Sequence, residues 1–102
     1  MLVAGTEPPD VVELWDWTLA PGDRHASEAH TPGTRELAQV QEGTLIVHVG
    51  EQSVSLEAGD AVTFPGDVPH AYANPGPRPA RFTLTVFEPG VGSASRSELA
   101  NV

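Results

Sequence analysis

Glycine and proline interrupt this chain at short intervals along its length. The sequence contains ten of each among 102 residues, and the apolar runs between them are short. Because these two residues are common in turns and rare inside helices and strands, their spacing favours many short strands over long helices. We therefore predict an all-β fold of the sandwich or barrel type.

Eight segments have the composition expected of strands. They cover residues 11–19, 26–30, 36–41, 44–49, 53–56, 61–64, 70–73 and 81–87. Gly50 and Glu51 join two alternating runs and predict a hairpin turn. Residues 74–79 carry three prolines and predict a loop, because proline cannot donate a hydrogen bond within a central strand.

These strands define one domain, because a chain of 102 residues can bury one core without cross-links such as disulfides. We expect the barrel to cover residues 11–88. Residues 1–10 form an N-terminal tail in this interpretation, and residues 89–102, which offer little apolar surface to bury, form a flexible C-terminal tail. The chain has no cysteine, so any metal must be bound through nitrogen and oxygen.

The chain is strongly acidic. Its five basic residues are all arginine, and together with fourteen Asp and Glu they give a formal net charge of −9. A negative field repels phosphate backbones and anionic lipids, which argues against direct nucleic-acid binding and against membrane association. The sequence has neither a signal-peptide pattern nor an apolar run long enough to span a bilayer. We expect a cytoplasmic protein.

Two short motifs, each beginning with a glycine, contain residues that bind metals. The first motif holds Glu28, His30 and Glu36, and the second holds His70. Imidazole and carboxylate groups suit Zn, Fe, Mn, Ni or Co, and such a ligand set leaves open positions for water or substrate. We therefore predict a divalent metal site formed by these four side chains.

The geometry of the strands constrains which ligands can meet. Glu28 and His30 are two residues apart, so they share a face if residues 26–30 form a strand. Glu36 joins them across a hairpin only if the connecting loop has an odd number of residues or an equivalent bulge. We predict such a connection.

The two motifs resemble those of the cupin superfamily, whose small members form a jelly-roll-like barrel called a double-stranded β-helix. The match covers residues 22–74. It implies that His30, Glu36 and His70 stand at metal-ligand positions. Glu28 replaces the first histidine of the family pattern, and a carboxylate there makes the site harder and more anionic.

A narrower resemblance is to the carboxy-terminal cupin domain of helix-turn-helix transcriptional regulators of the Xre type. In that family the cupin is thought to sense a small molecule while a separate domain reads DNA, so this chain resembles either the sensor half of a longer protein or a free-standing relative. The stretches that carry this resemblance are Glu13–Trp15, Leu19–Gly22, Glu28–Glu36 and Asp67–His70.

Two classes of function agree with these features. In the first, the protein is a metal-binding cupin that holds a small molecule in its barrel pocket as a ligand-sensing module. In the second, it is a small metal-dependent cupin enzyme of the dioxygenase, isomerase or lyase type, because a bound metal can act as a Lewis acid or bind dioxygen. One fold can host both classes, so the sequence does not choose between them.

A metal-free interpretation of the same residues also exists. In that alternative, the imidazoles of His30 and His70 are hydrogen-bonded to Glu28 and Glu36 inside a pocket without an ion. Elemental analysis would distinguish the two interpretations.

The remaining aromatic residues and histidines have several interpretations. Tyr72 shares a face with His70 and either contacts a ligand or fills the barrel, and Trp17, next to Trp15 on the first strand, either lines the ligand pocket or packs in the core or a dimer interface. We interpret His25 and His48 as structural or exposed. Because a small barrel leaves strand edges unpaired, we expect a homodimer.

Overall fold

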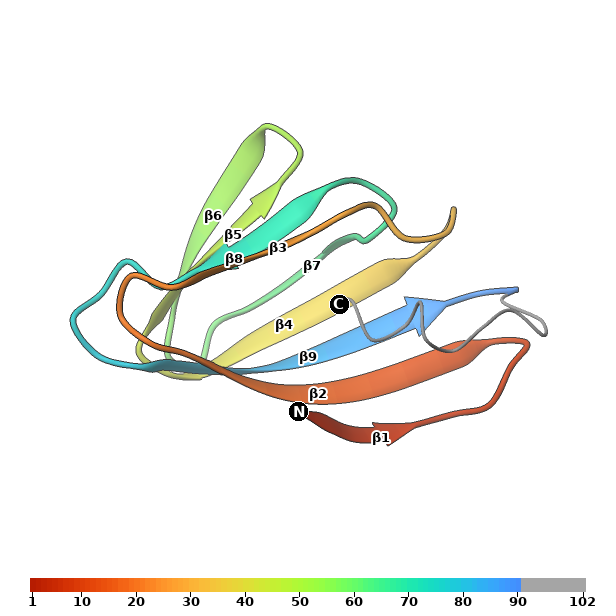
Figure 1. Cartoon of the computed structure of the whole chain (residues 1–102), viewed down its shortest axis with the longest axis horizontal. Helices are drawn as coiled ribbons and strands as arrows, with labels where there is room; N and C mark the ends of the chain where they lie inside the picture. Colours follow the sequence, from red (N-terminus) through yellow and green to blue (C-terminus); the bar gives the residue numbers. More distant parts are fainter. Residues whose placement is uncertain (91–102) are drawn as a thin grey trace.

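The computed structural model describes residues 1–90, which form two antiparallel β-sheets that face each other (Figure 1). The five-stranded sheet has the order β1-β2-β9-β4-β7, and the four-stranded sheet has the order β3-β8-β5-β6. The strands of this part of the chain are β1 (Leu2–Gly5), β2 (Val11–Leu19), β3 (Arg24–Ser27), β4 (Arg35–Glu42), β5 (Thr44–Val49), β6 (Gln52–Glu57), β7 (Ala61–Pro65), β8 (His70–Ala73) and β9 (Ala80–Glu88).

The all-β prediction is confirmed. Strands β2, β5 and β8 have the predicted bounds, and β4, β6, β7 and β9 extend beyond theirs by a single residue at one or both ends. Gly50 and Glu51 form the turn between β5 and β6, and residues 74–79 form a loop, as expected. Residues 1–90 contain no helix with the length and apolarity that crossing a bilayer requires.

Two strand predictions are wrong. Residues 2–5, assigned to a tail, form β1 and pair with the edge of β2. Strand β3 ends at Ser27, and it pairs with β8 in one sheet while β4 lies in the other sheet, so the expected hairpin between them does not exist. The pairing stops at Ser27 because its partner there, His70, is the first residue of β8. Residues 91–102 of the predicted C-terminal tail lie outside the described residues.

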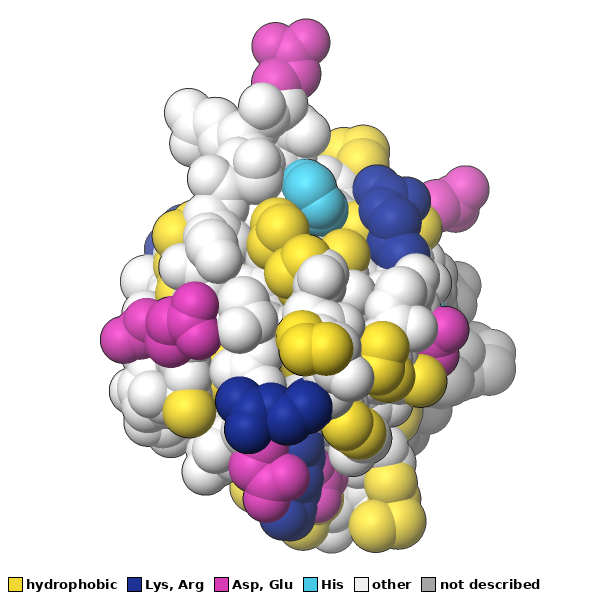
Figure 2. All heavy atoms as spheres, turned by 90° about the vertical axis from the view of Figure 1, so that its left-hand side faces the viewer, with side chains coloured by type: hydrophobic (Ala, Val, Ile, Leu, Met, Phe, Trp, Pro, Cys, Tyr) yellow, Lys and Arg dark blue, Asp and Glu magenta, His cyan; other side chains and the backbone are white. Residues whose placement is uncertain are grey.

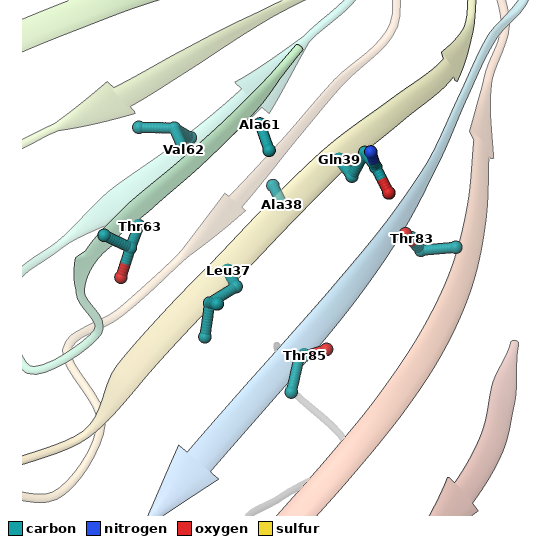
Figure 3. A pocket seen from close by; sticks show the side chains of 8 residues that line it. All are labelled: Leu37, Ala38, Gln39, Ala61, Val62, Thr63, Thr83 and Thr85. Carbon is teal, nitrogen blue, oxygen red and sulfur yellow. The ribbon is translucent and has the colours of Figure 1, made fainter. Parts of the chain in front are cut away.

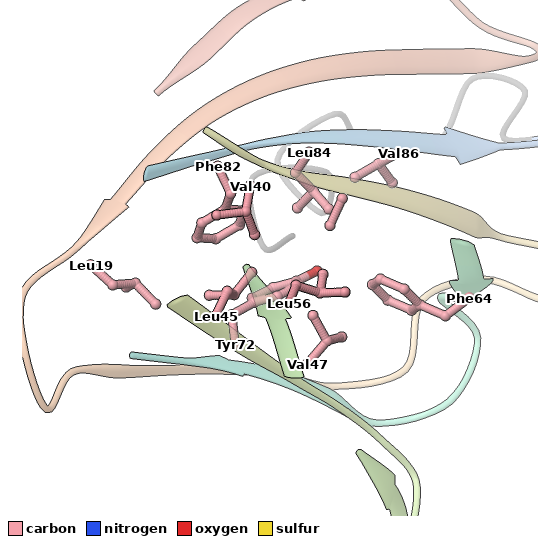
Figure 4. Packing of buried hydrophobic residues seen from close by; sticks show 11 residues of the cluster. Leu19, Val40, Leu45, Val47, Leu56, Phe64, Tyr72, Phe82, Leu84 and Val86 are labelled. Carbon is pink, nitrogen blue, oxygen red and sulfur yellow. The ribbon is translucent and has the colours of Figure 1, made fainter. Parts of the chain in front are cut away.

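The core fills the space between the two sheets (Figure 4). Side chains alternate between the two faces of each strand, and on β4 and β9 every second residue is buried. The buried cluster contains Leu19, Ala38, Val40, Leu45, Val47, Leu56, Phe64, Tyr72, Phe82, Leu84 and Val86, with Trp15, Trp17, Val49 and Val62 packed against it.

One end of the sandwich has a polar interior. It lies where β2 and β4 begin and β9 ends, because Glu13 and Glu36 both lie opposite Val86. Burial of so many polar groups is costly unless they bind one another or a ligand. The buried polar side chains at this end are Glu13, Ser27, Thr34, Glu36, His70 and Glu88.

Candidate metal centre

Three potential ligands from separate parts of the chain meet in the polar end of the sandwich. One ligand atom from each of His30, Glu36 and His70 lies within 4.8 Å of the other two. Glu36 and His70 are buried, whereas His30 is partly exposed. The structure therefore brings together three of the four residues that the sequence puts forward as ligands.

Glu36 belongs to the five-stranded sheet. It lies on β4, where its backbone pairs on both sides, with Phe64 of β7 and with Val86 of β9. Because residues alternate along the strand, Arg35 and Leu37 face outward and Glu36 faces the interior, where its side chain is fully buried. Its inward direction agrees with the prediction, although the hairpin argument behind that prediction does not hold.

The two histidines reach Glu36 from a strand and from a loop. His70 begins β8, which is paired with β3 and β5. His30 follows the end of β3, and its backbone N–H donates to the carbonyl oxygen of Gly66 at 2.9 Å. The N–H of Gly66 in turn donates to the carbonyl oxygen of Thr34 at 2.8 Å, so one residue ties both loops together.

One carboxylate oxygen is shared by both imidazoles. Oε2 of Glu36 lies 2.9 Å from Nε2 of His70 and 3.4 Å from Nε2 of His30. Oε1 of the same carboxylate accepts a hydrogen bond from the hydroxyl of Tyr72. Burial by itself raises the pKa of Glu36, but the hydrogen bonds that His30 and His70 donate when protonated at Nε2, the charge of His70 and the Tyr72 hydrogen bond outweigh it and lower the pKa from 4.5 to about 2. The carboxylate is therefore ionised at neutral pH.

The protonation of His70 is constrained by its second nitrogen. Nδ1 lies 2.8 Å from the carbonyl oxygen of Val68, which can only accept, so Nδ1 carries the proton. In a neutral ring, Nε2 then turns a lone pair toward Oε2 of Glu36, and neither atom has a hydrogen-bond partner within residues 1–90. Their 2.9 Å contact becomes favourable if Nε2 gains a proton or if a cation lies beside both atoms.

The pKa of His70 reflects the first of these two possibilities, the gain of a proton by Nε2. Burial lowers this pKa, but the hydrogen bond and the negative charge of Glu36 raise it, and the balance lies above 6.5. The ring therefore binds a proton more tightly than a free histidine when no metal is bound. Burial is the main cause that raises the pKa of Tyr72, and the same carboxylate raises it further, which keeps the phenol protonated.

Glu88 is a buried carboxylate of this site that the sequence analysis missed. Its Oε1 lies 4.0 Å from Nδ1 of His30, and its Oε2 accepts a hydrogen bond from the Thr31 hydroxyl at 3.3 Å. Burial, opposed by the nearby His30, raises the pKa of Glu88. A signal for it was available, because alternation places Glu88 on the same face as Val86, one residue beyond the predicted strand end.

Glu28 does not reach the group. It is exposed, whereas Ser27 beside it is buried, with its hydroxyl 3.4 Å from Nε2 of His30. That hydroxyl also donates to the backbone carbonyl of Glu28 at 3.1 Å. Because β3 ends at Ser27, the rule that residues two apart share a face does not extend to Glu28 and His30.

Aromatic rings continue from the site toward β2. Tyr72 is buried and bonded to Glu36, and its ring stacks with that of His25 at a centroid distance of 6.2 Å. The His25 ring lies 4.7 Å from that of Trp17, which is half-buried. The indole nitrogens of Trp15 and Trp17 are buried without a hydrogen-bond partner within residues 1–90.

Two larger hollows of the molecular surface contain none of the three candidate ligands, whereas a smaller one of 180 Å³ is lined in part by His70 and Ser27. A hollow of 470 Å³ on the outer face of the five-stranded sheet is lined by Leu37, Gln39, Thr83 and their neighbours (Figure 3). A second hollow of 600 Å³ lies between the edges of β6 and β7 and includes Phe64, whose ring is 5.6 Å from that of His70. The outer hollow contains none of the three candidate ligands, so its size does not make it the functional site.

Comparison with known proteins identifies the fold. The cupin domain family model matches residues 15–87, which include all three converging side chains. The chain belongs to the cupin family. Its two facing sheets are the double-stranded β-helix of that family. No curated protein matches the chain.

Two similar solved structures come from transcriptional regulators. The cupin domain of an XRE family regulator from Enterobacter cloacae is 32% identical, with a TM-score of 0.74, over 76% of this chain and 82% of that chain. An HTH_3 family regulator from Vibrio cholerae is also 32% identical, with a TM-score of 0.72, over 76% of this chain. The match spans 43% of the Vibrio cholerae chain, so this cupin corresponds to less than half of that regulator.

A third similar structure is described as an enzyme. It is a sugar phosphate isomerase of the cupin superfamily from Silicibacter pomeroyi. Its sequence is 26% identical, and the match covers 78% of this chain and 50% of that chain with a TM-score of 0.60. Regulators and enzymes thus share this barrel, which agrees with the general separation of fold from function.

The residues present fit a divalent metal ion, which cupins commonly bind. Two atoms that each lie about 2.1 Å from one ion are about 3.0 Å apart at a right angle and about 3.4 Å apart at a tetrahedral angle. The contacts of Oε2 of Glu36, at 2.9 Å and 3.4 Å, lie in this range. An ion would also satisfy Oε2 of Glu36 and Nε2 of His70, two of the five buried side-chain atoms within residues 1–90 that lack hydrogen-bond partners.

Proposed function

We propose that this cupin binds a divalent metal ion through His30, Glu36 and His70 and holds a small molecule beside it as a ligand-sensing module. The observation that carries the metal proposal is the buried contact between Nε2 of His70 and Oε2 of Glu36, which needs a positive charge between or on the two groups. Zn, Fe, Mn, Ni and Co all accept such nitrogen and oxygen donors.

The three side chains have distinct roles in this proposal. Glu36 supplies the anionic ligand and is held by the Tyr72 hydroxyl, while His70 is oriented by the Val68 carbonyl. Both histidines present Nε2 to the carboxylate. Three protein donors leave coordination positions open for water or for donor atoms of a small molecule, and a bound ion would polarise such a molecule. Glu28 is exposed and has no part in this ligand set.

We also propose that Trp17 and Tyr72 border the bound molecule. Trp17 is half-buried, and its indole nitrogen has no hydrogen-bond partner within residues 1–90, so it can donate to an acceptor on a ligand. Tyr72 is buried and acts mainly by fixing Glu36.

The sensing role is supported by the likeness to two regulators. Direct DNA binding by this chain is not part of the proposal, because the four arginines in residues 1–90 are all exposed and scattered. Figure 2 shows dark blue side chains at several places on one face, with magenta acidic side chains among them. Signalling therefore acts through another domain or subunit, with the ligand shifting an equilibrium by its differential affinity for two states.

We propose a cytoplasmic homodimer as the functional form.

A metal-dependent enzyme is the second candidate. The observation that favours it is the likeness to the cupin sugar phosphate isomerase. In that case the same three ligands hold the ion, and the open positions take a substrate instead of an effector. A redox-active metal in the purified protein would favour the enzyme.

Elemental analysis of protein purified without added metal tests the metal proposal. The wild type and His48→Ala should carry equal metal, because His48 points to the outer face with Ile46. The variants His30→Ala and His70→Ala should each lose it. Unchanged metal content in both of these variants would show that the site has been misplaced, and a wild type that takes up no Zn²⁺ or Co²⁺ after chelation and reloading would support the metal-free alternative.

A further inference from the structure

The two histidines of the site are anchored in different ways. Nδ1 of His70 lies 2.8 Å from a backbone carbonyl, and its own backbone belongs to β8. His30 lies in a loop, anchored through its backbone N–H to Gly66, and this bond does not fix the rotation of its ring. The ring of His30 therefore needs an acceptor from a side chain to hold Nε2 toward Glu36.

The geometry points to Glu88 as that acceptor, and we propose that Glu88 is a positioning residue for His30. The ring of His30 lies between two carboxylates, with Nε2 at 3.4 Å from Oε2 of Glu36 and Nδ1 at 4.0 Å from Oε1 of Glu88. This inference rests on the proposed metal site. A proton on Nδ1 attracted to Glu88 leaves the lone pair of Nε2 for the ion.

Glu88 is itself held in place. It is 4% exposed and closes β9, where its backbone lies opposite Val11 of β2. Thr31 donates to its other oxygen, and the Thr31 hydroxyl also lies 3.3 Å from that of Thr34. The separation of 4.0 Å between Oε1 and Nδ1 exceeds a hydrogen bond, so in this structure the two groups attract through charge, and the positioning role requires the metal-bound form to bring them within hydrogen-bond distance.

The chemistry of metal-bound histidine explains why such a residue is useful. A carboxylate that accepts from the far nitrogen fixes the tautomer and increases the basicity of the nitrogen that binds the metal. Loss of such a partner commonly weakens metal binding by about 10- to 100-fold. Glu88 does not contact the ion in this arrangement, because the imidazole ring of His30 lies between them.

Two substitutions at position 88 separate charge from hydrogen bonding. Glu88→Gln keeps a carbonyl acceptor and loses the charge, so we expect Zn²⁺ affinity to fall by about 10-fold. Glu88→Leu loses both the acceptor and the charge, so its Zn²⁺ affinity should fall by about 100-fold. Glu13→Gln is the matched control, because Glu13 is 3% exposed on the same inner wall and its charge acts on that of Glu88. We expect its affinity to stay close to that of the wild type, because Glu13 is not among the three converging candidate ligands.

Affinity is measured by competition with a chromophoric chelator, and ¹⁵N NMR of the histidine rings reports the tautomer of His30 in the Zn²⁺ form. We expect one tautomer with the proton on Nδ1 in the wild type and a mixture in Glu88→Leu. Urea unfolding in chelator separates positioning from folding, because replacement of a buried carboxylate by leucine should leave the metal-free protein at least as stable. If Glu88→Leu does not fold, Glu88→Gln alone decides the question.

The outcomes distinguish this inference from the metal proposal. Affinity within about threefold of the wild type at Glu88→Gln and Glu88→Leu, or an equal loss in Glu13→Gln, would overturn the role of Glu88 while the metal site stands. A wild type that binds no Zn²⁺ would remove both proposals. An affinity that depends on His70 but not on His30 would also overturn the role of Glu88, because there would be no ring for it to position.

Discussion

Nε2 of His70 lies 2.9 Å from Oε2 of Glu36, and both atoms are buried. The far side of the His70 ring is occupied by the Val68 carbonyl, and a second proton or a cation satisfies Nε2 and the carboxylate together on the near side. Proton and metal therefore compete for one position. This competition governs how stability and metal affinity vary with pH.

Without metal, the stability contributed by the pair of His70 and Glu36 should be greatest between about pH 4.5 and about pH 6.5. The pKa of Glu36 is depressed to about 2, so its contribution is present above 4.5 and is lost as pH falls toward 2. The pKa of His70 is raised above 6.5, so its contribution is present below 6.5 and is lost as pH rises through the folded value. Glu88 has a raised pKa, so its protonated form contributes stability that is present below 4.5 and is lost as pH rises through the folded value.

Urea unfolding in chelator, followed by tryptophan fluorescence from about pH 3 to about pH 8, measures this profile. The variant Glu36→Gln removes the partner charge and should flatten both limbs. Metal-free stability that rises steadily from about pH 6 to about pH 8 would contradict the assigned ion pair.

Metal binding should have the opposite dependence on pH. An ion requires the neutral form of Nε2 on His30 and His70, so binding releases protons, and affinity should fall by about tenfold per pH unit for each proton released. Because the pKa of His70 is raised, this loss should begin above pH 6.5 and become severe below about pH 6. Chelator competition at several pH values measures the slope, and a constant affinity between about pH 5 and about pH 8 would exclude histidine ligands.

Gly66→Ala should damage the site directly. A Cβ at this position would lie 2.7 Å from Cγ2 of Thr34 and 2.8 Å from Oε2 of Glu36. We expect a loss of about 1–3 kcal/mol in the free energy of unfolding from this overpacking, together with weaker metal binding as Glu36 is displaced.

Gly76→Ala is the control for this substitution, because its Cβ would be 3.5 Å from Oδ1 of Asn74, an ordinary contact. Chemical denaturation and the same chelator competition compare the two variants. Equal behaviour of both alanine variants would mean that Gly66 does not limit the space around the carboxylate.

Assembly is testable through the exposed apolar residues of β1 and β2. Leu2, Val3, Val12 and Leu14 are 42%, 55%, 38% and 38% exposed, and β1 is an edge strand. Pairing would cover them, so light scattering should report about twice the chain mass of 10.7 kDa. Leu14→Glu should shift the equilibrium to monomer, whereas Val54→Glu on β6 should not. A particle of 10.7 kDa at micromolar concentration would exclude the dimer.

DNA binding by this chain should be undetectable in a gel-shift assay with random duplex at low salt. Phosphate neutralisation requires clustered cations, and the arginines of residues 1–90 are scattered, with Arg81 already paired to Asp16 at 3.0 Å. A retarded band that disappears as salt is added would show that the charge argument is wrong.

The sequence predicted strands such as β4 and β9 because inward and outward residues alternate along most or all of their length. It did not predict β1, whose four residues are all exposed and therefore carry no such alternation. For the candidate site, motif spacing put Glu28, His30, Glu36 and His70 into one group, and the last three of these lie together in the structure. The sequence could not predict which strands pair, since β3 and β4 are neighbours in sequence but belong to different sheets.

The errors at individual side chains have the same origin. Glu28 was expected beside His30 on a strand, and the strand ends before either residue. Glu88 was missed because the predicted strand stopped at Phe87, although the buried positions Leu84 and Val86 continue to it. Local pattern thus locates a face of the barrel, and tertiary pairing determines where that face ends.

The division of the interior into an apolar end and a polar end makes this cupin a practical scaffold for protein engineering. The three candidate donors occupy strand ends and a loop, while the packed side chains around Phe82 and Leu45 lie elsewhere in the sandwich. Donor atoms can therefore be exchanged without replacing side chains of that apolar cluster. Replacing Glu36 by histidine, for example, would convert a mixed ligand set into three imidazoles and alter the preference among transition metals on an otherwise unchanged barrel.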